Sequence, residues 1–325
     1  MSQSPTPKVS ISIITYNHEQ FIARALDSVL SQKRDFDIEI IVGDDFSTDG
    51  TQDILKSYQD KYPNIIHLIL HPKHNPGIPG RVNNVTNIYA CRGEYVAMLD
   101  GDDYWTDKNK LQIQVDFLDR DNAHSVIGHT ALRVTPEGEV MDNYWMYGKI
   151  KEQAGSYSLY DILGIGWCFA QTSTLMFRNK QFAEFPEWFW NVVSADYVLL
   201  LLLARHGNLK YITEPMTAYT IHPNSFMANH YRTLEYITLK INELRLLKKL
   251  FLPKVGQECT KENRNQVNQG INKMIASYKY RYLQTLMREK KYASGMAFLF
   301  QCSFSDYSLP IFTKALFQNL RTSVE

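Results

Sequence analysis

The sequence has 325 residues, of which 44% are hydrophobic and 21% charged, and its formal net charge is +1. Such a chain can bury a sizeable core as one large domain or two, and it contains no internal repeat or low-complexity tract. Its densest apolar run, residues 197–204, is far shorter than the ~20 residues that span a bilayer, so we expect no transmembrane helix.

The cysteines and the polar start of the chain favour a cytoplasmic protein. Cys91, Cys168, Cys259 and Cys302 lie far apart and form no pair typical of a metal site, as expected in a reducing compartment. Met1–Lys8 is polar and contains proline, unlike a signal peptide. We therefore expect a cytoplasmic localisation.

The charge is unevenly distributed along the chain. Residues 230–325 contain 16 Lys and Arg against 7 Asp and Glu, whereas residues 1–229 contain 19 against 27. Because the two regions have net charges of opposite sign, we expect them to have different partners. A basic helical region can lie on anionic lipid, or it can be a packed subdomain with a solvated basic face.

Strands and helices alternate along the first hundred residues. Continuous apolar runs predict strands at 9–15, 37–43, 65–70 and 95–99. Apolar residues at helical spacing, and the caps before them, predict helices at 19–32, 53–62 and 81–90. This pattern is typical of parallel strands covered on both faces by helices, with ligands outside the carboxyl ends of the strands.

The second half of the chain continues with mixed elements and ends in helices. We predict helices at 108–118, 158–163 and 194–206, and strands at 125–134, 172–177, 209–213 and 217–221. Residues 137–156 are irregular and rich in Tyr, Met and Trp, as expected for a lobe over the site. Beyond residue 230 an apolar stripe at spacings of three and four predicts helices: Leu234, Ile237, Ile241, Leu244, Leu247 and Phe251.

Polar clusters follow three of the predicted strands. They are Thr15–Asn17, Asp44–Asp45 and Asp100–Asp102. Because parallel strands end at the same edge of a sheet, the fold is expected to bring these clusters together. Closely spaced carboxylates repel each other, and hard divalent cations such as Mg²⁺ or Mn²⁺ relieve this and bridge phosphates. The alternative is an acidic turn that caps a helix beginning near Asp107.

Four motifs extend this pattern to a known family. Lys8–Asn17, Ser28–Gln32, Asp44–Thr51 and Gly93–Asp103 resemble, in order and spacing, the motifs of family 2 glycosyltransferases. The resemblance covers roughly Val9–His222. It implies the GT-A fold, an α/β architecture with a mostly parallel sheet flanked by helices, and inverting transfer from a nucleotide-sugar donor. The C-terminal helical region lies outside it.

The resemblance also implies a division of the chain. We expect a GT-A catalytic domain over 1–229, with a nucleotide-sugar half at about 8–105 and an acceptor half at about 106–229. The basic helical region would then occupy 230–325.

The resemblance assigns the nucleotide base, commonly uracil, to Tyr16 and Asp45. Asp45 would accept the uracil N3–H, and the Tyr16 ring would stack. Thr15, Asn17 and Asp44 are expected beside them in the donor site. The alternative for Asp44 and Asp45 is capping of the following helix.

The D-x-D motif of the family corresponds to Asp100 and Asp102. Asp102 is expected to bind Mn²⁺ or Mg²⁺, and Asp100 the ribose or the same metal, while Asp103 is a further candidate. His222 is expected to bind metal or phosphate, with a purely structural histidine as the alternative. The metal would neutralise the departing diphosphate.

The catalytic base implied by the resemblance is Asp196, at the start of a predicted helix. The family usually has a Glu-Asp pair there, whereas this sequence has Ala195 before Asp196. The helix start lowers the pKa of a carboxylate, so burial or a neighbouring carboxylate must offset this effect. The alternative is that Asp196 only caps the helix.

Several further residues carry weaker expectations. Arg81 contacts the diphosphate or is a solvated residue at a helix start. His67, His71 and His74 decorate a strand end and a loop rather than binding metal. Three tryptophans form either a platform for a sugar acceptor or part of the core: Trp167, Trp188 and Trp190.

The sequence thus predicts a metal-dependent inverting glycosyltransferase that acts on a hydroxyl of a glycan or lipid-linked acceptor. The expected donor is a UDP-sugar. We expect no nucleic-acid partner, and peripheral contact with the inner face of a membrane through 230–325. One alternative is a nucleotidyltransferase, although Thr15–Gln20 lacks the glycines and basic residues typical of one. Another is a catalytically silent nucleotide-sugar-binding protein, which would keep Asp45 and Asp102 without needing Asp196.

Overall fold

The computed structural model describes residues 6–74, 80–142, 154–165, 170–181, 184–225, 233–251 and 260–301. The chain forms two compact units. The first comprises Met1–Leu159, Cys168–Phe185 and Asp196–His222, and the second comprises Tyr160–Trp167, Pro186–Ala195 and Pro223–Glu325. The second unit thus takes up two short earlier segments as well as the chain that follows residue 222.

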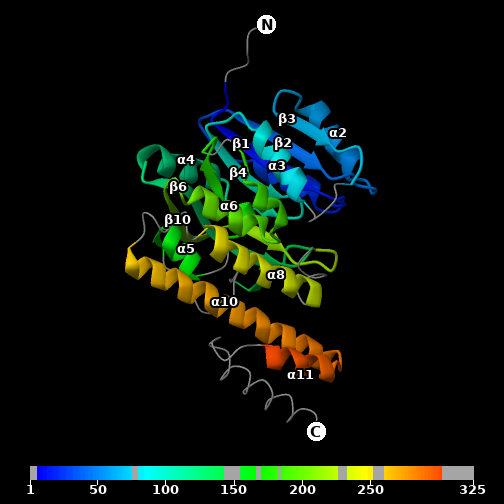
Figure 1. The fold of residues 1–325 in the computed structure, drawn as a ribbon. Coiled ribbons are helices and arrows are strands. Elements are labelled where there is room, and N and C mark those ends of the chain that lie inside the picture. The colour runs from blue at the N-terminus through cyan, green and yellow to red at the C-terminus, as the bar shows by residue number, and fades with distance from the viewer. Residues whose placement is uncertain are drawn as a thin grey trace. The chain divides into compact units, whose positions relative to one another are not determined.

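The first unit is built on the predicted parallel strands. These are β1 (Val9–Thr15), β2 (Ile38–Asp44), β3 (Ile66–Leu70) and β4 (Tyr95–Asp100). They lie side by side in the order β3-β2-β1-β4, and each neighbouring pair is parallel (Figure 1). The connecting helices are α1 (Ile22–Leu30), α2 (Thr51–Lys61) and α3 (Arg81–Ala90). The GT-A-like α/β architecture predicted from the sequence is confirmed.

The two faces of this sheet bury different side chains. Successive residues of a strand point to opposite faces, and Ile11, Ile40 and Val42 belong to one apolar core that also contains residues of α1, α2 and α4 (Lys110–Arg120). On the other face, α3 approaches so closely that it bonds to the strands themselves. Asn83 Nδ2 donates to Gly43 O over 2.7 Å, and Asn87 Nδ2 donates to Ile13 O over 2.8 Å.

The rest of the sheet is mixed rather than parallel. The remaining strands are β5 (Tyr104–Trp105), β6 (His124–Val134), β7 (Val140–Asp142), β8 (Gly155–Tyr157), β9 (Met176–Arg178) and β10 (Asn208–Thr220). Short β9 is antiparallel to both β4 and β6, between which it lies, whereas β6 and β10 are parallel. The short elements along this part of the chain are α5 (Leu159–Ile165), η1 (Thr172–Thr174), η2 (Glu187–Asn191) and α6 (Ala195–Leu203). Of these, η2 and nearly all of α5 belong to the second unit.

Three predicted strands differ from the structure. Residues 172–174 form a 3₁₀ turn instead of the start of a strand, because the Gln171 side chain accepts from Ser173 N over 2.8 Å, and such local bonds compete with strand pairing. The two predicted strands at 209–213 and 217–221 are the single strand β10. Its register shifts between Ile212 and Thr217, as expected for a bulge around Pro215, which has no N–H to donate. Most of the predicted lobe at 137–156 lies outside the described residues.

The second unit contains the predicted C-terminal helices. They are α8 (Leu234–Leu246), which continues into the π-helical turn η3 (Leu247–Phe251), α10 (Lys261–Arg288) and α11 (Tyr292–Gln301). The predicted stripe is buried at Ile237, Ile241, Leu244 and Leu247, and α8 packs along α10. Among the helices that the structure describes, none is both long and apolar enough to cross a membrane.

The approach of α3 to the sheet requires glycine at position 43. A Cβ atom there would lie 1.8 Å from Asn83 Oδ1 and 2.5 Å from Asn87 Oδ1. We expect Gly43→Ala to lower the free energy of unfolding by about 1–3 kcal/mol, because one of the two elements must shift. Urea denaturation measures this change. Gly295→Ala is the matched control, since the nearest atom there is at an ordinary 3.5 Å. An unchanged midpoint for Gly43→Ala would contradict the close packing.

Candidate active site

The strand register brings the three predicted polar clusters together. In the β1–β2 pair Thr15 lies opposite Asp44, and in the β1–β4 pair Ile14 lies opposite Asp100. Neighbouring strands are about 4.8 Å apart, so the ends of β2, β1 and β4 form one short edge. The expected convergence of these clusters is confirmed.

Asn17 and Asp44 hold the loop that follows β2. Asn17 has a positive φ of 54°, donates from its backbone N to Ser47 Oγ over 2.8 Å, and accepts from Thr48 N at its Oδ1 over 2.8 Å. The buried Asp44 carboxylate accepts from Ser47 N over 2.9 Å, from Gln52 Nε2 over 2.7 Å, and from the Ser47 hydroxyl. Both side chains therefore shape the loop, and their contact with a donor stays a prediction.

Tyr16 and Asp45 lie around a histidine that the sequence analysis did not assign to this site. The Nδ1 atom of His74 is 3.2 Å from a carboxylate oxygen of the buried Asp45, and the His74 ring centroid is 5.0 Å from that of Tyr16. The Tyr16 side chain is 43% exposed, so its ring is accessible. Thr15 is buried, and its carbonyl accepts from Asp45 N over 3.0 Å, which fixes Asp45 at the sheet edge.

The turn after β4 presents Asp102 to two histidines. His222 Nε2 lies 3.0 Å from Asp102 Oδ2, and His18 Nε2 lies 3.8 Å from the same oxygen. Gly101 allows this approach, because a Cβ atom there would lie 2.9 Å from the Thr15 side chain and 3.0 Å from His18 Nδ1. One ligand atom each of His18, Asp102 and His222 lies within 4.8 Å of the others. These three side chains fit a divalent cation, and Asp100 is not in the group.

The protonation states of this group also suit a cation. Burial by itself would raise the pKa of Asp102, but the facing His18 and His222 outweigh it, and the pKa lies below its usual value. Burial lowers the pKa of His18, against the opposing charge of Asp102. Since metals bind ionised carboxylates and neutral imidazoles, both shifts favour the forms that act as ligands.

Asp103 turns away from the edge and anchors the turn. Its carboxylate accepts from Gln171 Nε2 and Ser173 Oγ, each over 2.7 Å, and from Thr220 N over 3.0 Å. The side chain is only 1% exposed, and burial with the charges of Asp102 and Asp100 raises its pKa. Asp103 thus connects the acidic turn to the end of β10, two residues before His222.

Asp196 lies in the first turn of α6, close enough to Asp100 for their charges to interact. Burial raises the pKa of Asp100 to about 8, with further contributions from Asp102 and Asp196. The neighbouring carboxylate that the sequence analysis required beside Asp196 is therefore Asp100. The charge of Asp196 thus acts on the acidic turn, and its role as the base stays a prediction.

The other predicted residues have separate surroundings. Arg81 begins α3 and is only 4% exposed, so the alternative of a solvated arginine is wrong. Trp188 and Trp190 belong to η2, and Trp190 is 44% exposed. Trp167 lies outside the described residues.

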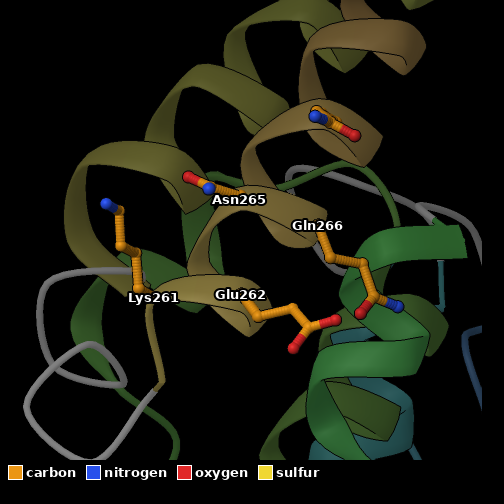
Figure 2. Close-up of a pocket in the computed structure, with 5 residues that line it drawn as sticks. Lys261, Glu262, Asn265 and Gln266 are labelled. Atoms are coloured by element: carbon orange, nitrogen blue, oxygen red, sulfur yellow. The ribbon is translucent and has the colours of Figure 1, made fainter.

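A separate pocket of about 530 Å³ lies along the start of α10 (Figure 2). Its lining is polar and contains none of the predicted site residues: Lys261, Glu262, Asn265, Gln266 and Gln269. Glu262 is the single carboxylate among these lining residues, and it is accompanied by Lys261 and amides rather than by further acids or histidines.

Comparison with known proteins agrees with this geometry. The family model described as glycosyl transferase family 2 matches residues 10–184, which is more than half of the chain. The chain belongs to glycosyl transferase family 2. The match covers β1–β4, the acidic turn and β9, whereas α6, His222 and the C-terminal helices lie beyond it.

This family 2 chain also resembles individual proteins. It is 32% identical over 224 residues to an uncharacterized protein of Mycobacterium tuberculosis, a match that spans 69% of this chain and 61% of that relative. The chain therefore covers less than two thirds of the relative's length.

Two solved structures have the same fold at low sequence identity. TarS 1–349 of S. aureus in complex with UDP-GlcNAc has a TM-score of 0.54 and 21% identity, covering 87% of this chain and 88% of that one. The mannosyltransferase PcManGT of Pyrobaculum calidifontis, in complex with GDP-Man and Mn²⁺, has a TM-score of 0.55 and 16% identity, covering 98% and 88%. At these identities the likeness establishes the fold alone.

The raised pKa of Asp100 predicts a pH-dependent stability of this family 2 chain. Its folded-state value of about 8 lies above the ordinary 3.8, so the folded state holds the proton more tightly than the unfolded state. The free energy of unfolding should therefore fall as the pH rises from about 4 to about 8. Asp100→Asn removes this loss of stability. The melting temperature of the variant minus that of the wild type, both measured in EDTA, should therefore grow as the pH is raised from 5 to 9. Each pKa unit between the folded and unfolded states corresponds to about 1.4 kcal/mol in the free energy of unfolding, or about 2–4 °C in the melting temperature.

The control for this experiment is Asp53→Asn, whose side chain is 90% exposed. Its melting temperature should follow that of the wild type at every pH. A difference between Asp100→Asn and wild type that stays constant with pH would contradict the assignment.

Proposed function

We propose that this chain is a metal-dependent, inverting glycosyltransferase. It moves a sugar from a nucleotide-diphosphate sugar, specifically a UDP-sugar, to a hydroxyl of a glycan or lipid-linked acceptor. The observation that supports the proposal is the charge interaction of Asp196 with Asp100, which ends β4 at the carboxyl edge that β1 and β2 share. Membership of glycosyl transferase family 2 supports a sugar transferase over the nucleotidyltransferase alternative.

The donor base is assigned to Tyr16 and Asp45. The buried Asp45 carboxylate accepts the N3–H of uracil, and the exposed Tyr16 ring offers a stacking surface. His74 lies against both and closes this part of the site. TarS, whose fold this chain shares, is known in complex with UDP-GlcNAc, which supports a nucleotide-sugar donor.

The diphosphate is assigned to the acidic turn. Asp102 and His222 hold the cation, and Asp100 contacts the ribose or the same cation. When bound, a divalent cation neutralises the charge of the departing diphosphate. Arg81 at the start of α3 adds a positive charge, and helix N-termini favour phosphate groups. The Mn²⁺ in the PcManGT complex supports a divalent cation in a protein of the same fold.

Asp196 acts as the general base. Its carboxylate takes the proton of the acceptor hydroxyl while the acceptor oxygen forms a bond to the anomeric carbon. The bond between that carbon and the diphosphate breaks on the opposite side, and its electron pair leaves with the nucleoside diphosphate. A single displacement of this kind inverts the anomeric configuration.

The acceptor and the cellular location are inferred from charge. Residues 230–325 carry 16 basic against 7 acidic residues, which favours anionic, phosphate-containing carriers over neutral ones. We assign the protein to the cytoplasm, with peripheral contact at the inner face of the membrane through this region.

Replacing the proposed base tests the chemistry. Asp196→Asn should lower the rate of sugar transfer by about 10²–10⁴-fold while UDP-sugar binding is retained, because only proton removal from the acceptor is lost. Single-turnover transfer and calorimetric donor binding measure the two effects. Asp60→Asn, at an exposed position of α2, is the control and should behave as wild type. Undiminished transfer by Asp196→Asn would exclude Asp196 as the base.

Replacing Asp45 tests the base pocket. Asp45→Ala should weaken UDP binding by about 10–100-fold, since a hydrogen bond to a charged group contributes about 1.5–3 kcal/mol. A thermal-shift panel of UDP- and GDP-sugars with and without Mn²⁺ measures binding, because a ligand of the folded state raises the melting temperature. Asp53→Ala serves as the exposed control. Equal shifts for wild type and Asp45→Ala would remove Asp45 from the donor site.

A further inference from the structure

We propose that His18 is a third protein ligand of the cation, and that the resulting set of two imidazoles and one carboxylate selects Mn²⁺ over Mg²⁺. The proposal rests on the proposed function only in taking Asp102 and His222 as cation ligands. It adds a residue that precedes them in the chain, on the turn after β1, and it predicts which metal the site prefers.

The spacing of the three side chains fits a shared ion. Two atoms that are each about 2.1 Å from one metal lie about 3 Å apart when perpendicular and about 4.2 Å apart when opposite. The Asp102 Oδ2 atom is 3.0 Å from His222 Nε2 and 3.8 Å from His18 Nε2. Both separations fall within this range, and all three ligand atoms lie within 4.8 Å of one another.

The His18 imidazole lacks a hydrogen bond among the residues that the structure describes. Its Nε2 is too far from Asp102 for one, and its buried Nδ1 lies against Gly101 with no acceptor. Buried polar groups are normally paired, and each exception needs an explanation. A cation between His18 and Asp102 would bind Nε2, the ring nitrogen that faces the carboxylate at 3.8 Å, whereas Nδ1 would keep its present surroundings.

The backbone and the neighbouring rings hold His18 in this position. Its N–H donates to Thr51 Oγ1 over 2.9 Å, which fixes the turn to the start of α2. Phe21 lies edge-on to the His18 ring at 6.2 Å and contacts the His222 ring at 4.9 Å between centroids. Phe21 therefore lies beside both of the imidazoles that face Asp102.

The donor set decides the choice of metal. Mg²⁺ prefers oxygen ligands and retains several waters, whereas Mn²⁺, although it binds nitrogen least tightly among the first-row divalent ions, still accepts imidazole ligands. A site with one carboxylate and one histidine still depends on the diphosphate to complete it. A second histidine gives three protein ligands, so we expect Mn²⁺ to bind before any nucleotide does, and Mg²⁺ to compete poorly.

Manganese EPR tests the proposal on the full chain. The signal of free Mn²⁺ falls on binding, and pulsed EPR detects coordinated ¹⁴N. The wild type should bind Mn²⁺ without nucleotide, show two histidine nitrogens, and release the ion only with at least a ~100-fold excess of Mg²⁺. His18→Ala and His18→Asn should each show one nitrogen and bind Mn²⁺ at least about tenfold more weakly.

The controls separate this proposal from the proposed function. His206→Ala, at an exposed position after α6, should bind Mn²⁺ as the wild type does. Melting temperatures in EDTA identify a variant that is merely unfolded, and of the two His18 variants the one that folds decides the result. Equal affinity and equal nitrogen coordination in wild type and the His18 variants would overturn the third ligand and leave Asp102 and His222 intact. Mn²⁺ binding by the wild type only in the presence of UDP would also overturn the third ligand alone. No Mn²⁺ binding with or without UDP would overturn both the third ligand and the cation site of the proposed function.

Discussion

The structure depends on how three carboxylates are accommodated within four residues at the end of β4. Each has a different environment. Asp103 turns into the protein and accepts three hydrogen bonds, and Asp102 faces His18 and His222. Asp100 lies between these arrangements with its pKa raised to about 8. Mutual repulsion of the three acids is thus relieved by hydrogen bonds at Asp103, by two facing imidazoles at Asp102 and by a raised pKa at Asp100.

The sheet supplies the geometry that makes this cluster a site. Register places Thr15 beside Asp44 and Ile14 beside Asp100, so residues far apart in sequence share one edge. The α3 helix is bonded to the same strands, and its first residue, Arg81, is buried beside them. Family 2 glycosyltransferases are matched over this part of the chain, whereas Asp196 and His222 lie beyond the matched residues. The proposed active site therefore combines strand ends inside the matched region with two residues, Asp196 and His222, that lie outside it.

Sequence patterns predicted most of this arrangement, and their failures have physical causes. Short runs rich in apolar residues define β1–β4, and the ends of these strands define the edge, so both followed from local properties. Local patterns do not reveal which of three neighbouring acids turns inward, because the partners of Asp103 come from distant segments, Gln171, Ser173 and Thr220. His18 was treated as part of a turn, since its role depends on Asp102 and His222. The only available signal was a histidine directly after a strand that ends beside acids.

The turn after β1 gives neighbouring residues separate tasks. The Tyr16 ring lies by His74, Asn17 fastens the loop after β2, and the backbone of His18 is tied to Thr51. With the proposed roles of Tyr16 and His18, three adjacent positions would connect nucleobase, loop and cation through a few peptide bonds. Efforts to redesign the enzyme for a bulkier purine donor at Tyr16 would consequently also disturb its metal preference, and the two properties would need to be optimised as one.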